Sequence, residues 1–128
     1  MPIVNRIADL HGDITAWRHD LHAHPELLYD VHRTAAAVAD KLKSFGCDEV
    51  VTGIGRTGVV GVIHGSKGPQ TTRKVVGLRA DMDALPIQEA TEVPYKSTVP
   101  GKMHACGHDG HTAMLLGAAR YLLSLIHI

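Results

Sequence analysis

The stretch Val75-Val76-Gly77-Leu78-Arg79-Ala80-Asp81-Met82-Asp83-Ala84-Leu85-Pro86 decides the fold that we expect for this chain. Its first part is almost continuously apolar, which is typical of a strand buried on both faces of a sheet. We therefore predict a strand over residues 74–80. Ligands and catalytic groups of α/β proteins collect at the carboxyl ends of such strands, where this sequence places two aspartates.

Those two aspartates, Asp81 and Asp83, are two positions apart, so both point to the same side if the backbone is extended. A carboxylate placed there can hydrogen-bond a metal-ligating histidine and fix its tautomer. The alternative is a turn cap or an ion pair with Arg79.

Two helices are predicted before the strands. Apolar residues recur every three or four positions over residues 3–23, and Pro25 ends that pattern. A second amphipathic pattern covers residues 31–45, with Gly46 as a plausible residue to end the helix.

Short β-branched runs predict further strands at residues 48–52 and 58–64, and a long apolar helix is expected to begin at Asp109 or Thr112. A loop rich in Pro, Thr and Lys covers residues 86–103. The expected fold class is α/β, with two N-terminal helices, a mixed sheet and a buried helix in layers.

Two patterns suggest sites that we do not favour. Residues 53–58 match the dinucleotide fingerprint G-x-G-x-x-G, but a strand-like run follows where a helix is required, so a hairpin connection is expected. His22, His24 and Glu26 suggest a helical metal motif, but Pro25 interrupts the helix, so packing and capping roles are preferred.

Composition excludes several classes of protein. The 128 residues contain 13 Lys plus Arg and 13 Asp plus Glu, which gives no electrostatic case for nucleic acid or an anionic membrane. No signal peptide is evident and no apolar run approaches the roughly 20 residues that span a bilayer, so a cytoplasmic protein is expected. A disulfide between Cys47 and Cys106 stays open as an alternative to free thiols.

The residues 103–111 contain three histidines and a cysteine, all candidate metal ligands. Cys106 and His108 are two apart, so they can share a metal only on a loop or strand end, where Gly107 would place them. His104 and His111 are weaker candidates. Taken singly, Cys106 also fits a small core residue and His104 a surface residue.

These motifs resemble one known family. His-Ala-Cys-Gly-His-Asp-Gly-His at 104–111, Leu-Arg-Ala-Asp-Met-Asp-Ala-Leu-Pro at 78–86 and Arg-His-Asp-Leu-His-Ala-His-Pro-Glu-Leu at 18–27 resemble metal-dependent amidohydrolases of the aminoacylase and carboxypeptidase family. The similarity is to the branch that includes the hippurate and indole-acetyl-amino-acid hydrolases. Family members are about three times longer, so the resemblance implies that residues 1–128 form the N-terminal portion of the catalytic domain.

The resemblance implies a hydrolase that cleaves the amide of N-acyl amino acids with a pair of manganese or zinc ions. It makes Cys106 and His108 metal ligands and Asp83 their support. From the residues themselves, Asp81, His104 and His111 stay weaker candidates. The general-base glutamate, the remaining ligands and the inserted domain that helps the enzyme dimerise are expected outside this chain. Arg56, where small residues are common, and the apolar ending at residues 124–128 depart from the family pattern.

Two other hypotheses stay open. One is a small non-catalytic metal-binding module that is complete as it stands, and the other is a thiol enzyme that uses Cys106. The apolar final helix also predicts exposed apolar surface and association of the isolated chain.

Overall fold

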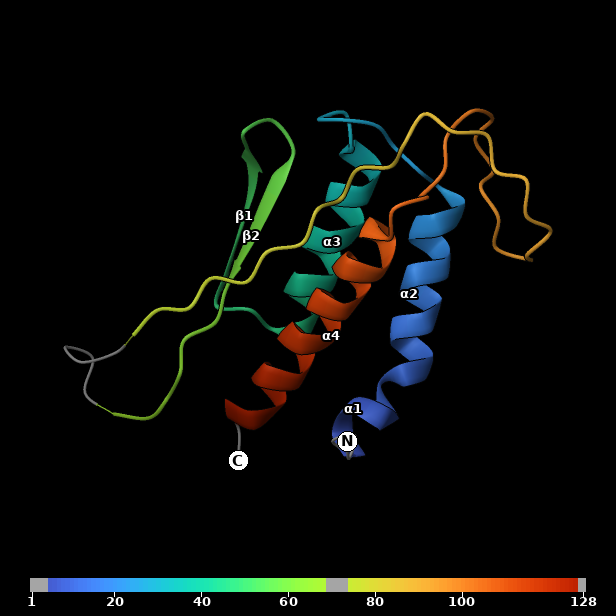
Figure 1. The fold of residues 1–128 in the computed structure, drawn as a ribbon. Helices are drawn as coiled ribbons and strands as arrows, with labels where there is room; N and C mark the ends of the chain where they lie inside the picture. Colours follow the sequence, from blue (N-terminus) through green and yellow to red (C-terminus); the bar gives the residue numbers. More distant parts are fainter. Residues whose placement is uncertain (1–4, 69–73, 127–128) are drawn as a thin grey trace.

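The computed structural model describes residues 5–68 and 74–126, which form helices and one β-hairpin (Figure 1). In chain order the elements are α1 (Asn5–Asp9), α2 (His11–Ala23), α3 (His32–Phe45), β1 (Glu49–Ile54), β2 (Gly58–Val62) and α4 (His108–Ile126). Helix α4 packs against α2 and α3, and the hairpin packs against α3. The expected α/β class with two N-terminal helical segments is confirmed. The expected mixed sheet is wrong for the described residues, where the sheet is an antiparallel hairpin.

The core lies where α3, α4 and the hairpin meet. Val38, Leu42 and Leu116 form its buried centre, and Trp17 of α2 closes it with a ring centroid 5.3 Å from that of Phe45. Helices α2 and α4 approach closely, because a Cβ on Gly117 would lie 2.6 Å from Cδ1 of Ile14.

The prediction of one continuous helix over residues 3–23 is wrong, because the structure has two helices there, α1 and α2. The amide of Leu10 donates to the carbonyl of Ile7 at 3.1 Å, a three-residue spacing that tightens the turn, and α2 begins one residue later. The start that we expected for the single helix, Ile3, lies outside the described residues. The second predicted helix is confirmed, and Gly46 ends it in the left-handed conformation with φ 89°.

The first turn of α3 takes its cap from a distant residue. The carboxylate of Glu26 accepts hydrogen bonds from the amides of Arg33 and Thr34 at 2.9 and 2.7 Å. These hydrogen bonds satisfy two of the amides that a helix start leaves unpaired. The capping role expected around Pro25 is therefore confirmed for Glu26.

Strands β1 and β2 form an antiparallel hairpin with a bulge between Thr52 and Ile54. A strand, and not a helix, follows the glycine-rich residues 53–58, which confirms the hairpin connection and excludes the dinucleotide fingerprint. Arg56 has φ 96°, a left-handed conformation that favours glycine, so the departure noted at this position places strain in the turn.

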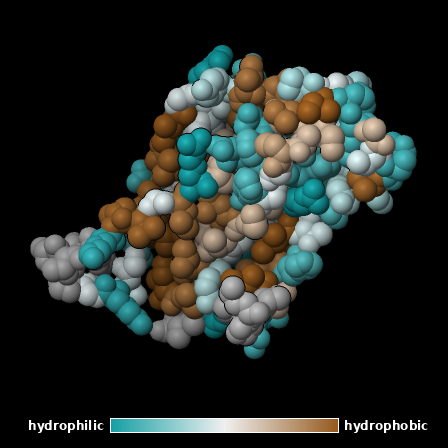
Figure 2. All heavy atoms as spheres, in the orientation of Figure 1, coloured by the Kyte–Doolittle hydropathy of each residue, from teal (hydrophilic) through white to brown (hydrophobic). Residues whose placement is uncertain are grey.

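The prediction of a buried strand over residues 74–80 is wrong, because this segment is exposed and belongs to no sheet among the described residues. Val75 and Val76 are 96% and 80% exposed, and the segment is extended without being paired in a sheet. A strand buried on both faces needs covering layers and strand neighbours, and the hairpin, whose two strands pair with each other, is the one sheet in the described part of the chain. In Figure 2, hydrophobic residues gather over the left and centre of the view.

The last helix begins one residue before the earliest start we expected, at His108. It buries Ala113, Leu116 and Leu123 but leaves Met114, Leu122 and Leu125 exposed by 60%, 42% and 39%. The expectation of exposed apolar surface is confirmed for these residues. Within residues 5–68 and 74–126, no helix is both long and apolar enough to cross a membrane.

Candidate metal centre

The sequence motifs meet at one end of the helical layer, where α2 ends and α3 and α4 begin (Figure 1). Short backbone pairings hold the segments there. Ala84 donates to the carbonyl of Glu26 at 2.7 Å, and Leu85 and Met103 exchange hydrogen bonds of 2.9 and 3.0 Å. Thr112 of α4 adds a hydrogen bond from Oγ1 to the carbonyl of Asp81 at 2.9 Å.

His108 is oriented by Asp83. Its Nδ1 lies 2.9 Å from the backbone carbonyl of Asp83 and 3.0 Å from Oδ1 of the same residue. Since both oxygens are acceptors, Nδ1 must be the donor. In a neutral ring Nε2 then holds a free lone pair, which is the arrangement that a metal-binding imidazole needs.

Asp81 is shared between two partners. Arg79 donates to its Oδ1 at 2.6 Å, and its Oδ2 lies 3.9 Å from Nε2 of His108. The hydrogen bond from Arg79 lowers the pKa of the Asp81 carboxyl below its usual value. The ion pair that we weighed as an alternative is therefore present for Asp81, while Asp83 contacts the histidine.

Among the described residues, the other candidates do not form a group of ligands around His108. Cys106 is exposed and Gly107 before His108 has φ 99°, which lets the chain turn there. The ring of His111 lies 5.8 Å from that of His108, centroid to centroid. Both cysteines are free, so the disulfide alternative does not apply.

His104 is 5% exposed, and neither of its ring nitrogens has a hydrogen-bond partner among the described residues. Burial lowers the pKa of this imidazole, which favours the neutral form that binds metals. A surface position for His104 is thus wrong, because the 103–111 turn folds inward against the end of α2, where the rings of His104 and His22 lie 6.4 Å apart.

The residues present fit part of a metal centre. A solvent-exposed thiol and an imidazole oriented by a carboxylate are donors suited to a borderline divalent ion. No group of three or more His, Cys, Asp or Glu residues that could hold a metal exists in the ranges that the structure describes. The described residues therefore supply fewer donors than a complete zinc site uses.

The sequence did not point to a buried ionic cluster beside this site, formed by Arg18, His22, Glu89 and Asp109. Nδ1 of His22 lies 2.7 Å from Oδ2 of Asp109, and its Nε2 lies 3.2 Å from Oε1 of Glu89. Nε of Arg18 also donates to Oδ2 of Asp109, at 3.1 Å. The Asp after His108 in the motif was a possible signal for Asp109, whereas nothing in the loop sequence identifies Glu89.

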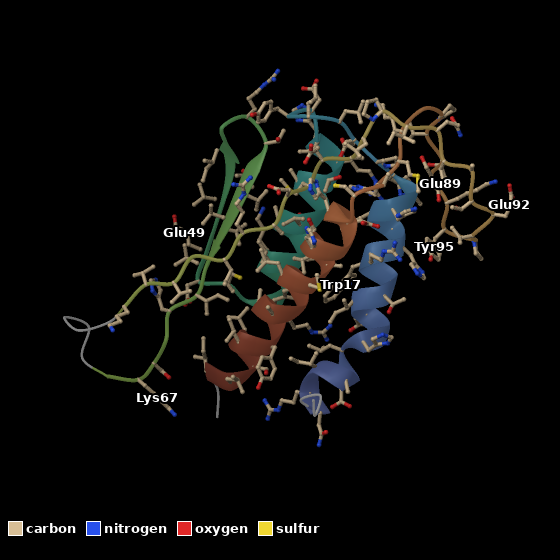
Figure 3. The ribbon with its side chains drawn as sticks, in the orientation of Figure 1. Trp17, Glu49, Lys67, Glu89, Glu92 and Tyr95 are labelled. Atoms are coloured by element: carbon tan, nitrogen blue, oxygen red, sulfur yellow. The ribbon has the colours of Figure 1, made fainter. Side chains whose placement is uncertain are left out.

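Glu89 also organises the loop at residues 86–103. Its Oε2 accepts the amide of Ser97 at 2.6 Å and its Oε1 accepts the hydroxyl of Thr91. Burial raises the pKa of Glu89, but these hydrogen bonds and that with His22 outweigh it and lower the pKa to about 2. Figure 3 shows Glu89 close to α2 and Glu92 at the outer part of the loop.

Tyr95 fastens the same loop to α2 (Figure 3). Its ring stacks on that of His19 with centroids 3.7 Å apart, and the guanidinium of Arg18 lies 5.4 Å from the ring centre. The loop that sequence alone described only by its composition is therefore held at both Glu89 and Tyr95.

Comparison with known proteins identifies relatives of this chain. The profile of Peptidase family M20/M25/M40 matches residues 77–127. The hippurate hydrolase of Campylobacter jejuni is 55% identical over 97% of this chain and 31% of its own length. The N-acyl-L-amino acid amidohydrolase of Geobacillus stearothermophilus is 47% identical over 95% of this chain and 32% of its own length.

Solved structures show the same fold. The Bacillus subtilis YXEP protein, a dinuclear metal-binding peptidase from the M20 family, superposes with a TM-score of 0.82 at 40% identity. The match covers 93% of this chain and 32% of that protein. The chain thus spans about a third of the length of the relatives that it matches.

Proposed function

Because the chain is a relative of the M20/M25/M40 peptidases in sequence and fold, we propose that it forms the N-terminal metal-binding part of a hydrolase acting on N-acyl amino acids. The relatives named hippurate hydrolase and N-acyl-L-amino acid amidohydrolase support this substrate class. The contact of Asp83 with Nδ1 of His108 is the observation that carries the proposal, since it leaves Nε2 available to a metal.

In this proposal the thiolate of Cys106 and Nε2 of His108 are two ligands of a manganese or zinc pair. Such a pair, when bound, supplies a Lewis acid that polarises the scissile carbonyl and lowers the pKa of water. Asp83 holds the His108 ring in the tautomer and direction that binding requires. Oδ2 of Asp81 lies 3.9 Å from Nε2 of His108.

The remaining parts of the site belong to residues other than these 128. They include the further ligands and a glutamate that takes a proton from water and returns it to the leaving amine. In this view residues 1–128 are the first portion of the catalytic domain. The whole protein is proposed to be a cytoplasmic homodimer or higher homo-oligomer whose partner molecule is the small N-acyl substrate.

Cobalt substitution tests the ligand assignment on the chain itself. We expect Co²⁺ to produce a thiolate-to-cobalt charge-transfer absorption that Cys106→Ala abolishes and Cys47→Ala leaves intact. Cys47 is a matched control, because it is the other cysteine and is half-buried in the core. Absence of the band in the unmodified chain, or its persistence in Cys106→Ala, contradicts the assignment.

Activity tests whether the site is partial. With manganese or zinc, the 128-residue chain is expected to hydrolyse neither hippurate nor N-acetyl amino acids above the Cys106→Ala control. Turnover clearly above that control would show that the chain holds a complete catalytic site and would overturn this part of the proposal. Activity that survives chelation but not thiol alkylation would instead favour a cysteine enzyme.

A further inference from the structure

The buried ionic cluster joins three segments that are far apart in the chain. His22 near the end of α2 contacts Asp109 in the first turn of α4 and Glu89 in the 86–103 loop, across 87 and 67 residues of sequence. The side chains of His22, Asp109 and Glu89 are 5%, 1% and 2% exposed. An ionic contact this deep is costly to desolvate unless its hydrogen bonds are satisfied.

The ring of His22 links the two carboxylates through its two nitrogens. Nδ1 faces Oδ2 of Asp109 at 2.7 Å and Nε2 faces Oε1 of Glu89 at 3.2 Å. In such contacts an imidazole N–H donates and a carboxylate oxygen accepts. The contact with Asp109 is the shorter of the two.

Asp109 connects the cluster to the candidate metal centre. It follows His108 directly and lies in the first turn of α4, where a carboxylate is favoured by the helix dipole. Arg18 and His22 hold the same oxygen, Oδ2, from the side of α2. Any movement of the turn that presents Cys106 and His108 must therefore stretch or break these contacts.

We propose that His22 is a positioning residue that acts through Asp109 to fix the turn at residues 104–108 against the end of α2. The inference rests on the proposed function only for its consequence, namely that Cys106 and His108 are held ready for a metal. The positioning itself concerns the apo chain and can be measured without metal.

Two substitutions separate positioning from general core stability. His22→Asn places its amide nitrogen where Nδ1 lies, so it can still donate to Asp109. His22→Gln places its amide nitrogen where Nε2 lies, so it keeps the contact with Glu89 and loses that with Asp109. Both remove the ring, which makes each variant the control of the other.

Hydrogen exchange of individual amides in the 128-residue chain is the decisive measurement. The reporters are the amides of His111, which donates to Gly107, and Ala105, which donates to Met103. Relative to buried α3 amides such as Leu42, we expect His22→Gln to lower their protection about tenfold or more. His22→Asn is expected to lower it much less, and His24→Asn and His24→Gln, at a half-buried neighbouring histidine, not at all.

Equal loss of protection in His22→Asn and His22→Gln, or a loss that simply parallels α3, would overturn the proposal. The unmodified chain gives a check if both variants unfold: ¹⁵N-detected spectra are expected to show a slowly exchanging Nδ1–H of His22 coupled across the hydrogen bond to Asp109. Failure to detect such a proton contradicts the arrangement.

Cobalt affinity provides the separate readout for the metal. If His22 positions the ligands, His22→Gln weakens Co²⁺ binding by about tenfold, as is typical when outer contacts of a site are lost, and His22→Asn does so less. If the unmodified chain shows no cobalt band, the proposed function fails while the exchange measurements still decide the role of His22.

Discussion

The contact between Asp83 and His108 is double, because the carboxylate and the backbone carbonyl both face Nδ1. Removing the side chain leaves the carbonyl at 2.9 Å, so the tautomer of His108 survives while the ring gains freedom to turn. We therefore expect Asp83→Ala to weaken zinc or cobalt binding by about tenfold, the lower end of the usual range for such partners. Competition with a chromophoric chelator measures this change.

Glu92→Ala is the control for Asp83→Ala, because the Glu92 carboxylate is 89% exposed and pairs with Lys96 at the surface. Its metal affinity should equal that of the unmodified chain. An unchanged affinity in Asp83→Ala would mean that the carbonyl alone orients His108.

The second prediction concerns how the contribution of Glu89 to stability depends on pH. Its pKa is about 2 in the folded chain and about 4.5 when unfolded, so its hydrogen bonds stabilise the fold fully above pH 4.5. This stabilisation is lost as the pH falls from 4.5 towards 2, where the folded carboxylate takes up its proton. The difference in unfolding free energy between the unmodified chain and Glu89→Gln should thus be constant near neutrality and shrink below pH 4.5.

Urea unfolding at a series of pH values measures this difference. Glu92→Gln is the control, since an exposed carboxylate should give a small difference at every pH. A difference between the unmodified chain and Glu89→Gln that stays constant down to pH 2 would contradict the role of the ionised Glu89 carboxylate.

At the residue scale, the spacing of residues along the chain predicted the contacts between side chains that are close in sequence. The two-residue spacing of Asp81 and Asp83 indicated that both face one side, and both lie near His108. The cluster of His22, Glu89 and Asp109 depends on how a helix, a loop and another helix pack together. No periodicity in a single sequence reports such long-range packing, so these residues could not be assigned from the sequence.

At the scale of the elements, the packing of α2 on α4 depends on Gly117. An alanine there would place Cβ 2.6 Å from Cδ1 and 3.0 Å from Cγ1 of Ile14. Alanine gains about 1 kcal/mol of helix propensity over glycine, but overpacking costs about 1–3 kcal/mol. We expect Gly117→Ala to destabilise the chain by about 1 kcal/mol in urea unfolding.

Two further variants test this explanation. Ile14→Val removes Cδ1, so the double variant should recover about 1 kcal/mol relative to the sum of the single effects. Gly12→Ala in α2 meets no atom within 4 Å, so it should leave stability unchanged or raise it by less than about 1 kcal/mol. Additive effects of Gly117→Ala and Ile14→Val would show that the close approach does not limit packing.

The hydrophobic pattern predicted the helices better than the strands. Helix α3 satisfies its pattern within the chain, because its buried residues meet α4 and the hairpin. The run at residues 74–80 has the composition of a buried strand, but pairing requires neighbours that the described residues do not provide. The break at Leu10 follows from a single tightened turn, which an apolar spacing of three and four residues does not distinguish from a continuous helix.

At the scale of the whole molecule, two groups of exposed apolar residues are candidates for an association surface. One is the extended segment with Val75, Val76 and Leu78, and the other is the outer side of α4 with Met114, Leu122 and Leu125. Figure 2 shows apolar side chains over the side of the hairpin and the extended segment. An extended segment also presents unpaired backbone groups, which makes it the stronger site for association.

We therefore predict that the isolated chain self-associates through the extended segment. Val76 is 80% exposed, and burying a valine is worth about 1.5–3 kcal/mol, so Val76→Lys should weaken association about tenfold or more. Met114→Lys adds the same charge to α4, where the backbone groups are already paired within the helix, and should weaken association less. Sedimentation equilibrium over a range of concentrations measures both effects. A chain that stays monomeric at every concentration would contradict the prediction, and a larger effect of Met114→Lys would transfer the association surface to α4.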